Sequence, residues 1–297
     1  MSKQYEKCNL CARFCGVNRY LSKGACGMTS QMKIARAALH HWEEPIISGT
    51  RGSGTIFFSG CSLSCVFCQN HDISRGQVGV DVDVQRLAEI MLNLQEQGAH
   101  NINLVTPTHF TPSIASSVRL AKENGLSLPI VYNTGSYDTV ENLKSLEGIV
   151  DVYLPDLKYS LPNTAQKYSS ATNYPSVARD AIAEMVRQIG EPIIDEEGII
   201  QRGVIVRILL LPGHVAEAKL SLKYLYDLYC DKIYVSLMNQ YTPMPSMQSP
   251  LNRGVTRAEY AQLTDYAEKL GVKNGFTQEF GTASESFIPP FDLTGVK

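Results

Sequence analysis

The sequence predicts an α/β fold built on a parallel sheet, and two observations carry this prediction. From residue 55 onward, apolar runs of strand length alternate with segments of helical periodicity, giving six strand–helix units in series. Polar residues suited to ligand binding follow each predicted strand. Serial units of this kind imply parallel strands with right-handed crossovers, but periodicity alone does not distinguish an open sheet from a barrel.

The first four units end near residue 189. Strands are predicted at residues 55–60, 102–105, 129–132 and 150–154. Helices are predicted at residues 83–97, 111–124, 138–148, 162–169 and 175–189. Asp81 or Asp83 can cap the first helix, Asp138 begins the third, and Pro112 and Pro175 suit the first position of two others.

The last two units follow a predicted surface excursion at residues 191–203. The strand at 204–211 is almost wholly apolar, as a strand buried on both faces should be. The later elements are a helix at 215–229, a strand at 233–238 and a helix at 256–270. The last helix opens with a capping box, Thr256 to Glu259, and residues 271–297 have no clear periodicity.

The composition fits a globular protein with one large domain and a small appendage. Of 297 residues, 44% are hydrophobic and 19% charged, with a net charge of −2. No basic stripe suits nucleic acid, and no charge run suits a membrane surface. Without a signal peptide or a transmembrane run, the chain is expected to be cytoplasmic. We divide it into a cysteine-rich, irregular extension at residues 1–50 and a main domain at residues 51–297.

Eight cysteines in a cytosolic chain are better explained as metal ligands than as disulfides, because the cytosol keeps thiols reduced. Four cluster near the N-terminus, namely Cys8, Cys11, Cys15 and Cys26. Four thiolates can close a tetrahedral zinc site or hold an iron–sulfur cluster, and the alternative is a small cap of reduced cysteines. Cys230 stands alone in an apolar run and is expected to be buried.

Three further cysteines directly follow the first predicted strand. Cys61, Cys65 and Cys68 have the spacing C-x3-C-x2-C, so their thiolates can converge on one inorganic centre. Structural zinc would need a fourth protein ligand, whereas an iron–sulfur cube can leave one iron for a ligand that is not protein. Three unrelated buried cysteines explain this spacing poorly. We therefore predict a metal centre here, separate from the N-terminal cysteines.

The remaining polar strand ends should meet this loop on one rim. They are Thr106 to His109, Asn133 to Ser136, Pro155 to Lys158, Pro212 to His214, and Asn239 to Tyr241. In parallel α/β folds, ligands gather at the carboxyl ends of the strands. Arg207 lies within an apolar strand, where an unpaired arginine would be costly. It is expected to have a carboxylate partner, either from a cofactor or from the protein.

The cysteine loop resembles the hallmark of radical S-adenosylmethionine (SAM) enzymes, which here reads Cys61-x3-Cys65-x-Phe67-Cys68. In detail the chain is similar to the pyruvate formate-lyase activating enzyme group and its uncharacterised relatives. The supporting motifs are Ser59-Gly60-Cys61 with Cys68-Gln69-Asn70, Asp156-Leu157-Lys158, Arg207 with Leu211-Pro212-Gly213, and the N-terminal Cys-x2-Cys-x3-Cys. The resemblance covers nearly the whole chain from about residue 45.

This resemblance implies a partial (β/α)6 TIM-like barrel in which the three cysteines hold a [4Fe-4S] cluster. The amino and carboxylate groups of S-adenosyl-L-methionine would chelate the fourth iron. An electron from the reduced cluster would break the sulfonium C–S bond, and the 5′-deoxyadenosyl radical would take a hydrogen atom from the substrate. The resemblance also implies an electron donor such as flavodoxin or ferredoxin.

The resemblance assigns cofactor-binding roles to several strand-end residues. Phe67 would pack near the adenine, and Asn133 and Thr134 would face the ribose or the methionine end. Asn239 or Gln240 occupies the position where related enzymes place a polar residue that contacts the cofactor.

Asp156 and Lys158 match the family's Asp-x-Lys pair, with Lys158 near the methionine carboxylate; the alternative is a lysine that only pairs with Asp156. The chain departs from the family after the second strand. The usual Gly-Gly-Glu, which receives the methionine amino group, is replaced by Thr106-Pro107-Thr108-His109. Thr106 or Thr108 could supply an oxygen acceptor. His109 could be a ligand, a proton donor or a packed histidine, and we count it with Lys158 among the catalytic candidates.

The expected function is that of a radical SAM oxidoreductase that abstracts hydrogen, and analogy names activation of a glycyl radical enzyme. A second enzyme hypothesis is radical modification of a peptide or a small metabolite. Two hypotheses from another functional class are a non-catalytic iron–sulfur electron carrier and a zinc-stabilised binding module. A carrier would not require polar residues at six strand ends.

Overall fold

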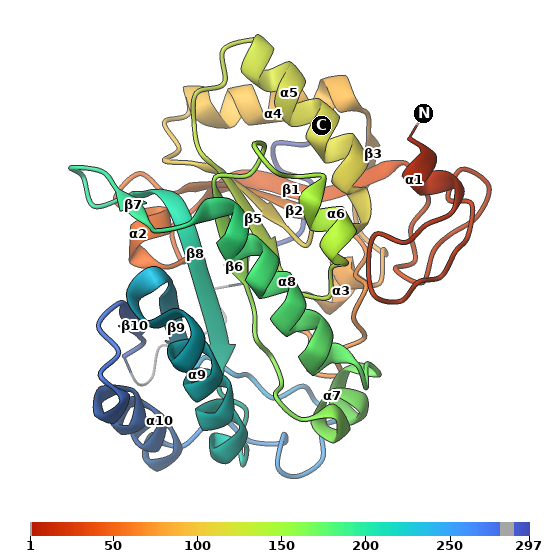
Figure 1. Cartoon of the computed structure of the whole chain (residues 1–297). Coiled ribbons are helices and arrows are strands. Elements are labelled where there is room, and N and C mark those ends of the chain that lie inside the picture. Colours follow the sequence, from red (N-terminus) through yellow and green to blue (C-terminus); the bar gives the residue numbers. More distant parts are fainter. Residues whose placement is uncertain (1, 280–287) are drawn as a thin grey trace.

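A computed structural model describes residues 2–279 and 288–297, and within them the chain forms an α/β fold around one mostly parallel sheet (Figure 1). The strands follow the order β10-β9-β8-β6-β5-β4-β2-β1-β3, and β7 pairs with β8. Pairing is parallel from β10 through β2 and antiparallel from β2 through β1 to β3. The edge strands β10 and β3 do not pair with each other, so the sheet is an open, partial barrel.

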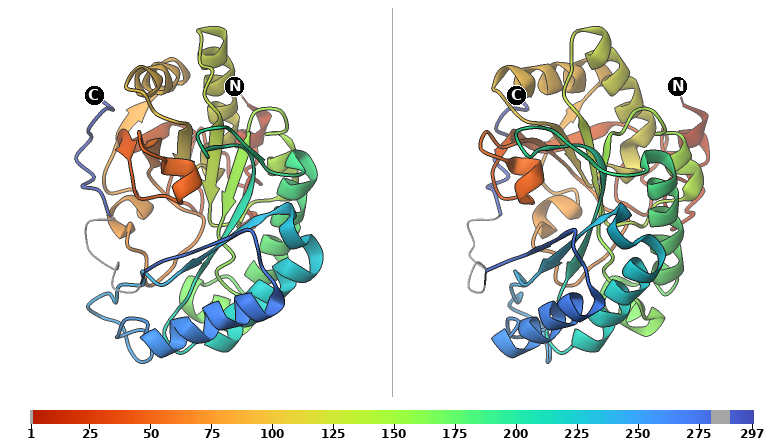
Figure 2. Two further views of the ribbon diagram at one scale, coloured as in Figure 1. Left: turned by 90° about the vertical axis from the view of Figure 1, so that its left-hand side faces the viewer. Right: turned by 60° about the vertical axis from the view of Figure 1, so that its left-hand side comes forward.

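The six predicted strand–helix units are confirmed. The strands are β2 (Ser53–Phe58), β4 (Ile102–Val105), β5 (Ile130–Thr134), β6 (Val152–Pro155), β8 (Ile200–Leu209) and β9 (Tyr234–Met238). The helices are α4 (Val84–Glu96), α5 (Thr111–Glu123), α6 (Val140–Lys144), α7 (Pro162–Ser169), α8 (Tyr174–Ile189), α9 (Val215–Tyr229) and α10 (Arg257–Leu270). The longer helices wrap around the outside of the sheet (Figure 2).

The helices form where the sequence supplies both a cap and an apolar face. In α4 the Asp83 side chain accepts a hydrogen bond from the Arg86 amide at 2.8 Å, and Leu87, Met91 and Leu94 are buried. The capping box of α10 is present as predicted. In the described part of the chain, no helix has the length and apolar character needed to cross a membrane.

The extension contains regular structure that the sequence did not predict. Residues 32–40, predicted to be irregular, form β1 (Met32–His40), which pairs antiparallel with β2. Tertiary pairing, and not local pattern, makes this segment a strand.

The other short elements of the described chain are α1 (Lys3–Glu6), α2 (Pro45–Ser48), α3 (His71–Ser74), β3 (Val80–Val82), η1 (Thr108–Phe110), β7 (Ile193–Ile194), η2 (Cys230–Lys232) and β10 (Gly275–Thr277).

Two other sequence predictions are wrong in detail. Asp138 does not begin α6, because Thr139 is the capping residue and its hydroxyl accepts from the Asn142 amide at 3.3 Å. Asp138 is instead a buried acceptor for the hydroxyls of Tyr132 and Thr134, at 2.8 and 2.7 Å. Cys230 is exposed and not buried, because it lies beyond the end of α9 with a left-handed φ of 45°.

The extension packs directly against the loop that carries Cys61. The Cys61 amide donates to the Cys26 carbonyl at 3.3 Å, and Arg13 Nε donates to the Ser62 carbonyl at 2.8 Å. Gly60 makes this approach possible. Its φ is +87°, and a Cβ at this position would lie 2.4 Å from Met28 Cγ and 2.9 Å from the Cys26 carbonyl oxygen.

We predict that Gly60→Ala lowers the free energy of unfolding by about 2–4 kcal/mol, because alanine would be strained at this φ and would also crowd the Cys26 carbonyl. Gly125→Ala is the matched control. Gly125 has a φ of +101° but nothing within 4 Å of its Cβ position, so only the conformational cost of about 1–2 kcal/mol applies. Urea unfolding at neutral pH measures both, and equal losses would contradict the close packing described for Gly60.

Candidate active site

A cavity lies at the carboxyl ends of β2, β4, β5, β6, β8 and β9, where the sequence predicts the binding site. Every one of these strand ends contributes to its lining, together with the loop that carries the three central cysteines. The cavity encloses about 1310 Å³, its open mouth included. The predicted convergence is therefore present for the cysteine loop and for four of the other strand ends, whereas Pro212 to His214 are not among the described lining residues and β8 contributes Arg207 and Leu209 instead.

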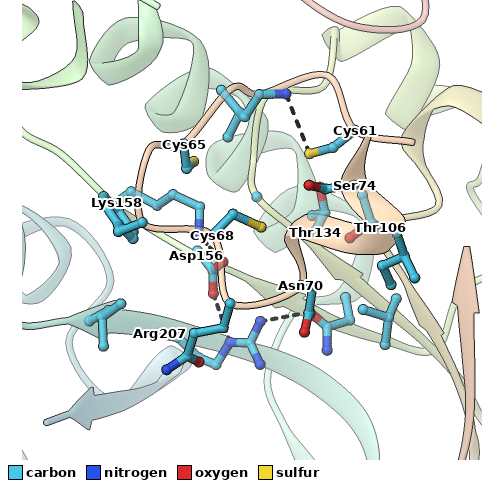
Figure 3. A pocket seen from close by; sticks show the side chains of 18 of the residues that line it. Cys61, Cys65, Cys68, Asn70, Ser74, Thr106, Thr134, Asp156, Lys158 and Arg207 are labelled. Carbon is cyan, nitrogen blue, oxygen red and sulfur yellow. Dashed lines mark hydrogen bonds and ion pairs between the residues drawn. The ribbon is translucent and has the colours of Figure 1, made fainter. Parts of the chain in front are cut away.

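Cys61, Cys65 and Cys68 all line this cavity and are partly buried (Figure 3). The Leu63 amide donates to Cys61 Sγ at 3.4 Å, and the Ser169 hydroxyl donates to Cys65 Sγ at 2.9 Å. Burial, together with repulsion between the thiolates, raises the pKa of Cys61 to about 12. Burial also raises the pKa of Cys65, so without a cation the thiols of Cys61 and Cys65 keep their protons, and metal binding would release them.

Arg207 anchors a network of charges on the strand side of the cavity (Figure 3). Its Nε donates to Asp156 Oδ1 at 2.8 Å, its Nη1 to Glu43 Oε2 at 3.2 Å, and its Nη2 to Asn133 Oδ1 at 2.6 Å. Lys158 Nζ donates to the other oxygen of Asp156 at 2.5 Å. The carboxylate partners of Arg207 thus come from the protein itself.

The charges in this network shift one another's pKa values. Burial alone would raise the pKa of Asp156, but Arg207 and Lys158 hold it below its usual range. Burial would lower the pKa of Arg207, but Asp156 and the two glutamates before α2 raise it. Burial raises the pKa of Glu43 despite the nearby guanidinium. Asp156, Lys158 and Arg207 are therefore charged at neutral pH and hold one another in place.

Glu43 is a member of this network that the sequence did not indicate. Its Oε1 accepts from the side-chain amides of Asn103 and Asn133 at 3.1 and 3.3 Å, while its Oε2 pairs with Arg207. The residue lies in a polar stretch between β1 and α2, and it does not belong to any of the six strand ends that form the cavity. No local pattern distinguishes it from a solvated loop residue, and only the fold brings it under the cavity.

Most of the other predicted binding residues also line the cavity. They are Phe67, Thr106, Thr108, Asn133, Thr134 and Gln240. Phe67 is 6% exposed and packs edge-on against Tyr241, with ring centroids 5.9 Å apart. Gln69, Asn70 and Ser74 also line the cavity, although the sequence motifs assign no role to them.

His109 and Asn239 do not line the cavity. His109 is 1% exposed, and its Nε2 contacts the Ser59 carbonyl at 2.8 Å beneath the cysteine loop. Burial and the neighbouring Arg19 lower its pKa to about 3, so it is neutral. This placement fits the packed-histidine alternative and not a catalytic one. The Asn239 side chain donates to the backbone carbonyls of Gln278 and Glu279.

The four N-terminal cysteines lie outside this cavity. Cys8, Cys11 and Cys26 are buried, and Cys15 is partly buried. A Cβ on Gly24 would lie 3.4 Å from Cys26 Sγ and 3.5 Å from Cys15 Sγ, so both thiols lie close to Gly24. Among residues 2–279 and 288–297, no three cysteine, histidine or acidic side chains stand in positions ready to hold a metal ion, and this applies to both cysteine groups.

The donor set of the cavity nevertheless fits an iron–sulfur cluster with one open iron. Three thiols from a single loop face a cavity whose described lining contains no fourth cysteine and no histidine. A cluster held there would present its remaining iron toward the cavity. Lys158 and Arg207 add fixed positive charge, which suits an anionic group of a bound cofactor.

Comparisons with known proteins agree with this geometry. The sequence matches the family model of the radical SAM superfamily over residues 55–225, more than half of the chain. It is also 30% identical over 281 residues to the uncharacterized protein MJ0674 of Methanocaldococcus jannaschii, covering 90% of this chain and 76% of that protein.

Solved structures also share the fold, including the following two. A radical SAM methyltransferase from Sphaerobacter thermophilus is similar with a TM-score of 0.54 at 17% identity, covering 79% of this chain and 69% of that one. SuiB of Streptococcus suis bound to its precursor peptide SuiA is similar with a TM-score of 0.51 at 12% identity, covering 78% of this chain. The chain spans about half the length of SuiB, covering 51% of it. At these identities the likeness concerns the fold alone.

We predict that Glu43→Ala lowers the free energy of unfolding by about 2 kcal/mol, because Arg207 loses one of two partly buried carboxylate partners. Glu147→Ala is the matched control. Glu147 also pairs with an arginine, Arg187, at 2.9 Å, but both side chains are more than half exposed, at 54% and 51%. Its loss should cost less than about 1 kcal/mol. Chemical unfolding at neutral pH distinguishes them, and a loss at Glu43 no larger than the loss at Glu147 would contradict the buried network.

The low pKa of Asp156 also predicts an acid-dependent loss of stability. Because the folded state holds the proton of Asp156 less tightly than the unfolded chain does, the stabilisation is present above the ordinary value of 3.8 and fades as the pH falls through the folded pKa. The stability difference between wild type and Asp156→Asn should therefore be largest at pH 7, about 3 kcal/mol, and should narrow below about pH 4.

Urea unfolding at pH 7, 4 and 3 measures this difference. The exposed Asp265 provides the control for the substitution itself, since Asp265→Asn should change the stability at pH 7 by less than about 0.5 kcal/mol. A difference for Asp156→Asn that stays constant over this range would contradict the ion pairs assigned to Asp156.

Proposed function

The chain belongs to the radical SAM superfamily, and from this premise we propose that it is an iron–sulfur enzyme that reductively cleaves S-adenosyl-L-methionine and abstracts a hydrogen atom from its substrate. The observation that carries the proposal is the convergence of Cys61, Cys65 and Cys68 with the Lys158–Asp156–Arg207 network on one cavity. When bound, a [4Fe-4S] cluster and SAM supply the electron and the 5′-deoxyadenosyl radical.

Different residues of the cavity would bind the cluster and the separate groups of SAM. Cys61, Cys65 and Cys68 would hold the cluster. Lys158, whose ammonium Asp156 holds at the cavity wall, would neutralise the methionine carboxylate. Thr106 and Thr108 line the cavity where relatives carry a glutamate, and their hydroxyls would accept from the methionine amino group.

The remaining lining residues would enclose the nucleoside. Phe67, fixed by Tyr241, offers an aromatic edge for the adenine. Asn133, Thr134 and Gln240 line the same cavity and would supply polar contacts to the ribose. By excluding water, this enclosure would also protect a radical from side reactions.

Within this chemistry, we propose that the substrate is a protein, and specifically a glycyl radical enzyme. The support is the set of motifs shared with the pyruvate formate-lyase activating enzyme group, above all Asp156-Leu157-Lys158 and Arg207 with Leu211-Pro212-Gly213. Flavodoxin or ferredoxin would supply the electron. Incubation of the reduced, SAM-loaded protein with purified pyruvate formate-lyase would then give a glycyl radical signal in electron paramagnetic resonance (EPR). SAM cleavage without this signal would favour a peptide or a small metabolite as the substrate.

The N-terminal cysteines carry a second, separate proposal. We propose that Cys8, Cys11, Cys15 and Cys26 hold zinc or a second iron–sulfur cluster, since three of these four side chains are buried in one small extension. Metal analysis of the variant that lacks Cys61, Cys65 and Cys68 isolates this site. About one zinc or about four irons per chain would support the proposal, and a metal-free chain would contradict it.

The central proposal predicts that anaerobic reconstitution gives a brown protein that forms 5′-deoxyadenosine on reduction with dithionite. Cys65→Ala should lower this activity at least about 100-fold, because the cluster loses one of three ligands. Cys230→Ala is the matched control, because the same substitution at an exposed site outside the cavity should leave the rate unchanged. Chromatography of the products measures the rate. If Cys65→Ala cleaves SAM as fast as wild type, the assignment of the cysteine loop fails.

A further inference from the structure

The three cysteines of the cavity are not equivalent in their hydrogen bonding. In the described part of the chain, Cys65 Sγ receives a hydroxyl donor, Ser169 Oγ at 2.9 Å, whereas Cys61 Sγ receives a backbone amide at 3.4 Å. Ser169 is the last residue of α7 and is fully buried. Its hydroxyl therefore points from the helix end into the loop and is shielded from water.

A second hydroxyl lies behind the first. The hydroxyl groups of Tyr159 and Ser169 are 2.7 Å apart, and Tyr159 is also fully buried. Since a serine hydroxyl has one hydrogen and Ser169 donates it to Cys65, the Tyr159 hydroxyl is the donor to Ser169. The result is a buried chain from Tyr159 through Ser169 to Cys65 in which each bond polarises the next.

Arg13 of the extension fixes the position of these hydrogen-bonded groups. Its guanidinium donates to the carbonyls of Ser169 and Ser170 at the end of α7, at 3.1 and 2.5 Å. The same side chain donates through Nε to the carbonyl of Ser62, next to Cys61, at 2.8 Å. One arginine therefore fastens the end of α7 to the cysteine loop, which fixes the distance between Ser169 and Cys65.

We propose that Ser169, supported by Tyr159 and held in place by Arg13, tunes the reduction potential of the iron–sulfur cluster through its hydrogen bond to Cys65. The proposal rests on the proposed function, since it requires a cluster on the three cysteines. Hydrogen bonds to cluster sulfurs stabilise the more electron-rich, reduced state and so raise the potential. Removing the donor should make the cluster harder to reduce.

The test is a redox titration monitored by EPR on the reconstituted chain, following the signal that changes when SAM is added. In Ser169→Ala the ratio of reduced to oxidised cluster at a fixed potential should fall on the order of threefold to tenfold, where tenfold corresponds to about 59 mV for one electron. Tyr159→Phe removes only the outer donor, so it should shift the potential in the same direction by less. Ser176→Ala, an exposed serine at the start of the next helix, is the matched control and should not shift it.

The iron content of each variant distinguishes an effect on the reduction potential from a loss of the cluster. If Ser169→Ala binds wild-type amounts of iron and its potential is unchanged, the inference is overturned. If Ser169→Ala does not retain its cluster, Tyr159→Phe decides, and an unchanged potential there overturns the inference. A wild-type chain that takes up a cluster but does not cleave SAM would contradict the proposed function while leaving the potential measurement valid. A wild-type chain that takes up no cluster on this loop would overturn both the proposed function and this inference.

Discussion

An arginine that is largely shielded from water inside a parallel sheet is the constraint on which the cavity depends. Arg207 lies in β8 among apolar neighbours, and only 13% of its side chain is exposed, so its guanidinium needs carboxylate partners close by. The fold meets this need with Asp156 from the next strand, Asn133 from the one beyond it and Glu43 from the segment before α2. These partners come from parts of the chain that are far apart in sequence. The same ion pairs also position Lys158 at the wall of the cavity.

The cysteine loop faces this network and is held from the opposite side. Its backbone bonds to Cys26, its carbonyl at Ser62 accepts from Arg13, and His109 supports Ser59 beneath it. The N-terminal extension is thus packed against the loop. This contact explains why the loop can keep its cysteines at the cavity with few regular elements of its own.

Much of the site could be predicted from local sequence motifs, whereas the parts that depend on contacts between residues distant in sequence could not. The spacing of Cys61, Cys65 and Cys68 and the rule that ligands gather at strand ends located the cavity, because both act within a few residues. The need of Arg207 for a carboxylate was also predictable, but Glu43, 164 residues away, was not. The strand-end rule places a residue near the rim without fixing its direction, so it does not foresee that His109 and Asn239 lie outside the lining of the cavity. β1 was missed because its strand conformation depends on pairing with β2.

The central claim is that the three cysteines leave one iron of a cluster open for a cofactor in this cavity. Mössbauer spectroscopy of the chain reconstituted with 57Fe tests it most directly, with SAM absent and then present. One iron site of the cavity cluster should change its isomer shift when SAM binds, and Cys65→Ala should abolish the change. Spectra that are identical with and without SAM would contradict the account.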